Sequence, residues 1–172
     1  MKQIPSQEYL LSVLDYDPET GVLRWKNRAD IPPKLNGRYA GKVAGTVKPS
    51  TYGHRLRVIA LTNKGGVFRA HRIIWKMVHG VDPLAEIDHA NGDPLDNRLC
   101  NLREATHQQN MCNRKPKRKN KGAYFHRVSG LWRASITASG REISLGYFKT
   151  PEAAHEAYVH AAREHHGEFA GL

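Results

Sequence analysis

The stretch DHANGDPLDNRLCNLREATHQQN, residues 88–110, gives the strongest indication of the fold. Short strands are predicted at 85–89 and 99–103, and the Asn-Gly-Asp-Pro run between them is typical of a turn-rich loop. Thr106 followed by Gln109 is a capping box, which predicts a helix that begins there and carries Asn110 in its first turn. The stretch therefore predicts the order strand, loop, strand, helix.

Asp88, His89 and Asn110 form a set of side chains that can hydrolyse a phosphodiester. Such hydrolysis needs a base that takes a proton from water and a cation that stabilises charge on the phosphate oxygens. His89 is the candidate general base, and Asp88 and Asn110 offer oxygen ligands to one divalent cation, magnesium or manganese. An isolated Asp-His pair is more often an ordinary surface or turn pair, and His107 is an alternative metal ligand.

The same stretch resembles the HNH endonuclease family, in particular its phage and intron-encoded homing-type branch. The resemblance rests on the pair Asp88-His89, on Asn101 and on Asn110. It implies a strand-strand-helix unit that binds one metal, with His89 as general base and Asp88 and Asn110 as metal ligands. It also implies that Asn101 braces the loop of the catalytic site. In this chain Asn110 stands where the final H of the name HNH denotes a histidine. An amide oxygen at this position favours a hard metal, which prefers oxygen ligands, over zinc.

The composition indicates a polyanionic partner. The chain has 172 residues, with 27 Lys and Arg against 16 Asp and Glu and a formal net charge of +11. Such a charge attracts nucleic acid, although it can also serve solubility alone. The two cysteines, Cys100 and Cys112, favour free thiols over a disulfide framework or a Cys-rich zinc module. With no secretory signal and no run of about 18 apolar residues, the sequence predicts a soluble, intracellular and cytoplasmic protein.

The region before the motif, residues 1–64, is predicted to be strand-rich. Its predicted elements are a helix at 7–14 and strands at 22–25, 41–47 and 54–61. A further helix, at 70–79 and ending at Gly80, is predicted between this region and the motif.

A basic segment follows the motif. Residues 112–121 hold six basic side chains and no acidic one, so 114–121 is predicted to be an extended linker. It is either a plain hydrophilic tether or a strap that follows DNA phosphates, and the strap fits the charge of the whole chain better. Its candidate DNA contacts are Arg114, Lys115, Lys117, Arg118 and Lys119.

Residues 122–172 predict a three-stranded meander followed by one helix. The strand patterns are at 123–127, 131–137 and 142–148. Thr150 and Pro151 predict the start of the helix, and a stripe of alanines with Tyr158 lets it pack closely on the sheet.

This segment resembles the Apetala-type DNA-binding domain, on Trp132, the Leu-Gly-Tyr-Phe run at 145–148, Tyr158 and the Gly-Glu-Phe-Ala run at 167–170. The resemblance implies that the sheet face opposite the helix enters the major groove of DNA. Strand alternation directs Trp132, Ala134 and Ile136 toward the helix and Arg133, Ser135 and Thr137 outward. The candidate DNA contacts are Arg127, Arg133 and Arg141, with Glu142 on the same face.

Together these patterns predict an α+β chain. Its parts are a strand-rich region at 1–64, a metal-binding HNH nuclease core at 65–113, a basic linker at 114–121, and a DNA-binding domain at 122–172 whose three-stranded antiparallel sheet packs on one helix. The expected function is metal-dependent hydrolysis of double-stranded DNA by a monomer that nicks one strand. The alternatives are a non-catalytic DNA-binding regulator built on a decayed homing endonuclease, and an RNA-binding protein.

Overall fold

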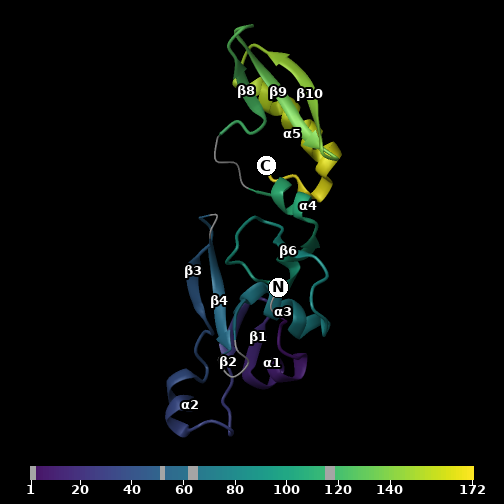
Figure 1. Cartoon of the computed structure of the whole chain (residues 1–172). Helices are drawn as coiled ribbons and strands as arrows, with labels where there is room; N and C mark the ends of the chain where they lie inside the picture. Colours follow the sequence, from purple (N-terminus) through teal and green to yellow (C-terminus); the bar gives the residue numbers. More distant parts are fainter. Residues whose placement is uncertain (1–2, 51–52, 62–65, 115–118) are drawn as a thin grey trace. The chain divides into compact units, whose positions relative to one another are not determined.

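The computed structural model describes residues 3–50, 53–61, 66–114 and 119–172, and Figure 1 follows the chain through them. The chain divides into two compact units, residues 1–105 and 106–172. Within the described ranges, the first unit has one buried cluster and three small antiparallel sheets, and the second has two buried clusters and one antiparallel sheet. The fold is therefore a mixture of helices and antiparallel strands, as predicted. The functional domain boundaries remain predictions.

The first unit combines short helices with short strands. Its helices are α1 (Gln7–Val13), α2 (Pro33–Tyr39) and α3 (Ala70–His79). Its strands are β1 (Leu14–Asp17) paired with β2 (Val22–Trp25), the sheet β3 (Thr46–Pro49), β4 (Arg55–Leu61) and β5 (Gly66–Arg69), and β6 (Glu86–His89) paired with β7 (Leu102–Ala105). A short 3₁₀ turn, Leu99–Asn101, precedes β7.

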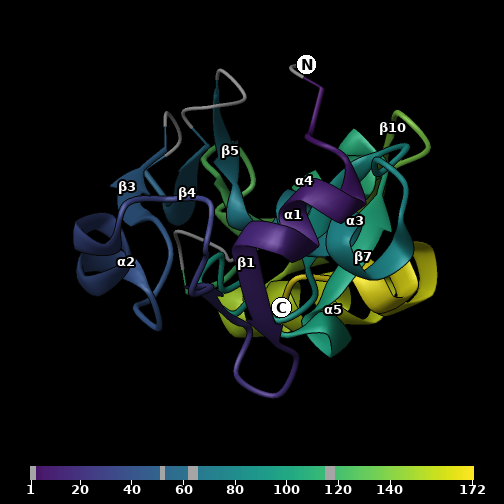
Figure 2. The ribbon, with the colours of Figure 1, turned by 90° about the horizontal axis from the view of Figure 1, so that it is seen from below.

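Helix α3 forms over the predicted residues and packs into the core of this unit. Ile73 and Ile74 are fully buried, and Gly80 ends the helix in a left-handed conformation with φ of 78°. The helix contacts α1, β4 and β5, and Figures 1 and 2 show α1 and α3 side by side. Fully buried side chains from several elements complete this core, namely Leu10, Leu14, Leu23, Ile59 and Leu61.

Two of the predicted strands are wrong in part. The strand predicted at 41–47 forms only from Thr46, because Gly41 and Gly45 adopt positive φ angles that interrupt an extended backbone. The strand predicted at 99–103 forms only from Leu102. Its first half is the 3₁₀ turn, which directs the polar groups of Asn101 to the preceding loop instead of to a neighbouring strand.

Gly21 fixes the position of the β1–β2 hairpin against the loop that follows β6. Its φ is +71°, and a Cβ atom on it would lie 2.5 Å from the backbone carbon of Asn97 and the backbone nitrogen of Arg98. Only glycine allows so close an approach of two backbones. The N-terminal hairpin therefore supports the segment in which the candidate site lies.

The second unit contains α4 (His107–Cys112), the strands β8 (Ala123–His126), β9 (Leu131–Ala138) and β10 (Arg141–Phe148), helix α5 (Pro151–His166) and a 3₁₀ turn, Gly167–Phe169. The strands form one antiparallel sheet in the order β10-β9-β8, and α5 contacts all three. Thr150 caps α5 and Pro151 begins it, as predicted.

The predicted alternation along β9 is confirmed. Ala134 and Ile136 are buried in clusters with residues of α5, and Trp132 packs against the same side. Thr137 is exposed, and Arg133 and Ser135 are half-buried. The sheet therefore has one face covered by α5 and a second face with polar side chains.

Among the described residues no helix has the length and apolar character needed to cross a bilayer. Cys100 and Cys112 are both free cysteines.

Lys121 ties the end of α4 to the C-terminal tail. Its Nζ donates hydrogen bonds to the carbonyl oxygens of Cys112 at 3.0 Å, Arg114 at 3.1 Å and Gly171 at 2.6 Å. The backbone N–H of Gly171 also donates to the carbonyl of Cys112. Because α4 buries none of its own side chains and its last carbonyls need partners, this half-buried ammonium stabilises the helix end.

We expect Lys121→Met to lower the free energy of unfolding of the second unit by about 1–3 kcal/mol, because three carbonyls lose a charged donor. Amide hydrogen exchange over α4 should become faster. Lys149→Met, which removes the same charge from an exposed position, is the matched control and should leave both quantities unchanged. Equal exchange over α4 in wild type and Lys121→Met would show that Lys121 does not hold this helix.

Candidate active site

The β6–β7 hairpin presents the Asp-His pair at the end of a strand. In its antiparallel register Asp88 lies opposite Arg103 and His89 lies opposite Leu102. Asp88 and His89 are 5% and 7% exposed, so neither is the surface pair that an isolated Asp-His sequence usually represents. The hairpin therefore holds both side chains in a buried environment.

Arg103 forms an ion pair with Asp88. Both Nε and Nη2 of Arg103 lie 3.0 Å from Oδ2 of Asp88, and the two side chains are 16% and 6% exposed. A buried carboxylate needs such a partner, because the loss of hydration is compensated only by paired charge and hydrogen bonds. Asp88 thus lies next to His89 with its Oδ2 shared by Arg103.

His89 is in contact with two further polar side chains. Its Nε2 lies 3.1 Å from Oδ1 of Asn97, and its ring meets the ring of His71 edge-on at a centroid distance of 5.1 Å. Burial lowers the pKa of His89, although the Asn97 hydrogen bond and the nearby charge of Asp88 act in the opposite direction. Burial, followed by the proximity of His89, lowers the pKa of His71 well below its ordinary value. His89 is therefore neutral at neutral pH, as a general base must be.

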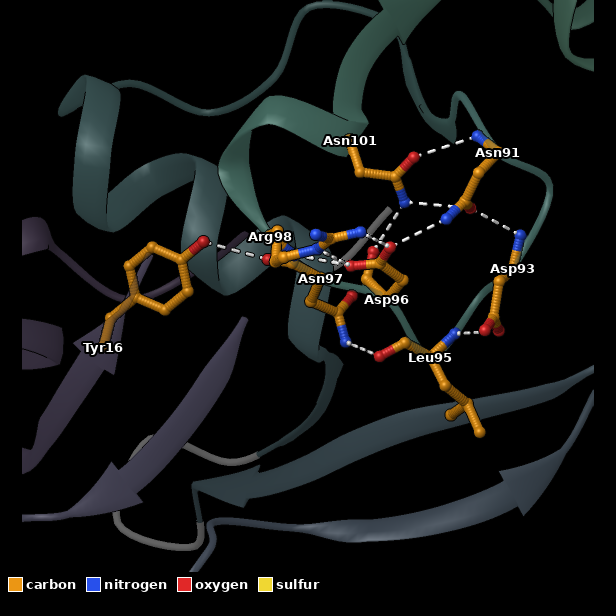
Figure 3. Close-up of polar contacts among 8 residues, drawn as sticks. All are labelled: Tyr16, Asn91, Asp93, Leu95, Asp96, Asn97, Arg98 and Asn101. Carbon is orange, nitrogen blue, oxygen red and sulfur yellow. Dashed lines mark hydrogen bonds and ion pairs between the residues drawn. The ribbon is translucent and has the colours of Figure 1, made fainter. Parts of the chain in front are cut away.

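Asn101 closes the loop between β6 and β7, as Figure 3 shows. Its Nδ2 donates to Oδ1 of Asn91 at 3.0 Å and to the carbonyl of Asp96 at 2.8 Å, and its Oδ1 accepts from the backbone N–H of Asn91 at 2.9 Å. Its own carbonyl accepts from the N–H of Ala90. One buried amide side chain therefore joins the first residues of the loop to the last ones.

Asp96 connects this network to Arg98. Oδ2 of Asp96 accepts from Nδ2 of Asn91 at 2.7 Å, and both carboxylate oxygens accept from Arg98, at 2.8 and 2.6 Å (Figure 3). The Arg98 hydrogen bonds are the main reason that the pKa of Asp96 falls to about 2. Asp96 is therefore ionised and already bonded within the loop, and it is not a candidate for the general acid or base.

Asn110 lies in the second unit, in the first turn of α4. The predicted capping box is present: Thr106 accepts from the N–H of Gln109, and the Gln109 side chain accepts from the N–H of Thr106. His107, the alternative ligand, is the first residue of the same helix and is exposed.

The candidate DNA contacts of the second unit differ in their surroundings. Arg127 and Arg141 are exposed, whereas Arg133 is half-buried and pairs with Glu142 at 3.2 Å. Arg133 lies in register between Tyr124 of β8 and Tyr147 of β10, on the sheet face away from α5. In the linker, Arg114 is half-buried and Lys119 is exposed, and Lys115, Lys117 and Arg118 lie outside the described residues.

The sequence interpretation missed Arg103, Asn97 and Tyr16 as parts of this site. Arg103 could have been found, because antiparallel pairing of the two predicted strands places a basic residue opposite Asp88. Asn97 and Tyr16 give no comparable signal, since the contacts of Asn97 depend on the path of the loop and Tyr16 is 81 residues away along the chain.

Comparison with known proteins assigns part of the chain to a family. Residues 68–112 match the family model described as HNH endonuclease. The match includes Asp88, His89, Asn101 and Asn110, and it continues across residue 105, where the first compact unit ends.

A relative and a solved structure are also similar to this chain. Protein 3.8 of Escherichia phage T7 is 33% identical over 107 residues, which cover 59% of this chain and 88% of the phage protein. A structure of the HNH homing endonuclease I-HmuI, described for DNA binding and cleavage, gives a TM-score of 0.41 at 16% identity, covering 96% of this chain and 91% of that one. This chain contains an HNH endonuclease domain and belongs to the same family as Protein 3.8.

Proposed function

We propose that this chain is a metal-dependent DNA endonuclease in which His89 is the general base. The observation that carries the proposal is a neutral, buried imidazole at the end of β6, directly after a buried carboxylate and inside the HNH match. A neutral imidazole can take a proton from water, and this step typically contributes about a hundred- to ten-thousand-fold to a hydrolytic rate.

Asp88 and Asn110 are the proposed metal ligands. Among the described residues no cluster of three or more His, Cys, Asp or Glu side chains could hold a metal, which argues against a zinc site built from protein ligands alone. A single carboxylate with an amide oxygen suits magnesium or manganese, since magnesium keeps several waters and takes further oxygens from a phosphate. Such a cation stabilises negative charge on the phosphate and on the leaving oxygen.

Arg103 makes Asp88 suitable for this role. It contacts Oδ2 of Asp88 with both Nε and Nη2 and so fixes the direction of the carboxyl group. Metal-binding carboxylates are commonly held in this way by a hydrogen-bonding neighbour. We propose that Asn101 acts indirectly, because its hydrogen bonds to Asn91 and Asp96 hold the loop that follows His89 in one conformation.

Double-stranded DNA is the proposed substrate, and one general base per chain favours a monomer that nicks one strand. The net charge of +11 supports a polyanionic partner. We further propose that the basic linker and the outer face of the β8–β10 sheet bind the duplex, as the resemblance to the Apetala-type domain implies. The row Tyr124, Arg133 and Tyr147 across this face supports that role, because arginine can read guanine in the major groove.

The first test is His89→Ala, measured on an end-labelled DNA duplex with magnesium. Cleavage should fall by about 100- to 10,000-fold while DNA affinity stays the same. His160→Ala, which removes an exposed histidine of α5, is the control and should cut like wild type. An alanine variant at position 89 that cuts at the wild-type rate would remove His89 from the mechanism. DNA binding without any cleavage by the wild type would favour the non-catalytic regulator.

The metal assignment is tested at Asn110, because truncating Asp88 would also leave the buried Arg103 guanidinium without its partner. Asn110→Ala should weaken manganese binding in a calorimetric titration, roughly 10- to 100-fold, and Asn110→Asp should restore it. Gln108→Ala, at an exposed position of the same helix, is the control. Unchanged manganese affinity in Asn110→Ala would place the ligand elsewhere, with His107 tested next.

The ion pair between Arg133 and Glu142 generates a prediction about DNA affinity. Glu142→Gln should raise affinity for duplex DNA about two- to fivefold, because Arg133 loses a competing partner and the face loses a negative charge. Glu156→Gln removes the same charge from α5, which covers the opposite face of the sheet, and should change affinity less. Equal effects of the two substitutions would mean that the face with Arg133 does not contact DNA.

A further inference from the structure

The contact between His89 and Asn97 determines which imidazole nitrogen carries the proton. Nε2 of His89 lies 3.1 Å from Oδ1 of Asn97. An amide oxygen only accepts hydrogen bonds, so the ring nitrogen opposite it must be the donor. In the neutral imidazole the proton is then on Nε2, and Nδ1 carries the lone pair.

The orientation of the Asn97 amide is itself fixed by its neighbours. Its Nδ2 donates to the carbonyl of Leu95 at 3.3 Å, and a carbonyl cannot serve as a donor. The amide nitrogen must therefore point to Leu95 and the amide oxygen to His89. The N–H of Leu95 in turn donates to Oδ1 of Asp93 at 3.0 Å (Figure 3).

Residues of the β1–β2 hairpin hold the backbone of Asn97 in place. The hydroxyl of Tyr16 donates to the Asn97 carbonyl at 2.9 Å, and burial raises the pKa of Tyr16 to about 12, which keeps the hydroxyl protonated. Gly21 touches the same backbone from the β1–β2 turn. Asn97 is 2% exposed, so its side chain has little room for another rotamer. An asparagine fixed on so many sides can impose a geometry on His89.

We propose that Asn97 is a positioning residue that holds His89 in the Nε2–H tautomer, so that Nδ1 takes the proton from the attacking water. This inference rests on the proposed function of His89. In the step, the water oxygen bonds to phosphorus while one of its two protons moves to Nδ1. The bond from phosphorus to the leaving oxygen breaks, its electron pair stays on that oxygen, and the oxygen takes a proton from solvent. The imidazolium formed keeps its Nε2–H donor on Asn97, which stabilises it. The arrangement parallels the way an orienting carboxylate serves the histidine of a hydrolase triad.

Asn97→Leu removes the acceptor while keeping a side chain of similar size, and it should lower the cleavage rate about 10- to 100-fold. Asn97→Asp keeps an oxygen acceptor and should recover most of that loss. Because Asn97 acts through His89, Asn97→Leu should have no further effect on the residual rate of His89→Ala. A purely structural asparagine would lower both rates alike, and that result would overturn the proposal.

The tautomer is measured directly by long-range ¹H–¹⁵N correlation on the full chain with labelled histidine, at a pH where His89 is neutral. The resonances of His89 are those missing in His89→Ala. Wild type should show protonated Nε2 and unprotonated Nδ1, and Asn97→Leu should show a mixture of the two tautomers. Protonated Nδ1 in wild type would contradict the proposal.

The cleavage rates of the variants distinguish the two proposals. If His89→Ala cleaves normally, the proposed function fails. If His89→Ala is impaired but the Asn97 variants cleave like wild type, the positioning role alone fails.

Discussion

The candidate site depends most on the hydrogen bonds that the amide side chain of Asn101 makes. It bonds to Asn91 at the start of the loop and to Asp96 near its end, while its backbone carbonyl receives the N–H of Ala90. Without such a link, the connection between β6 and β7, residues 90–101, would be free to move relative to β6. With the link, Asn97 stays within hydrogen-bonding distance of His89. The side-chain bonds of Asn101 are partly buried, and an unsatisfied buried partner costs more than a made bond contributes.

Strand register explains how a small antiparallel hairpin can position the side chains of the candidate active site. β6 and β7 are four residues each, and their register alone places Arg103 opposite Asp88. That pairing gives the buried carboxyl group of Asp88 a cationic partner. The N-terminal region adds the hydroxyl of Tyr16 and the close contact of Gly21, so the strand-rich region supports the loop as well as filling the core of the unit.

Local sequence signals predicted the elements whose causes are local. The capping box of α4, the left-handed Gly80 after α3, and the Thr150-Pro151 start of α5 are all where the sequence places them. The 3₁₀ turn at Leu99–Asn101 was not predictable from alternation, because it directs the polar groups of Asn101 to the loop that precedes it. Likewise Asp88 and His89 stand out in the sequence, whereas Asn97 and Tyr16 acquire their contacts only through the fold. The grouping of α4 with the second compact unit depends on Lys121 and the C-terminal tail, and local sequence patterns do not contain such contacts.

The proposed nuclease activity of the Asp88-His89 hairpin is tested most directly by conversion of supercoiled plasmid. The purified chain is incubated with magnesium, and with magnesium plus excess chelator. We expect open-circular product with magnesium, appearing before any linear product, and no conversion with chelator. Equal conversion with and without chelator would contradict the metal-dependent mechanism, and no conversion with either magnesium or manganese would contradict the assignment of nuclease activity.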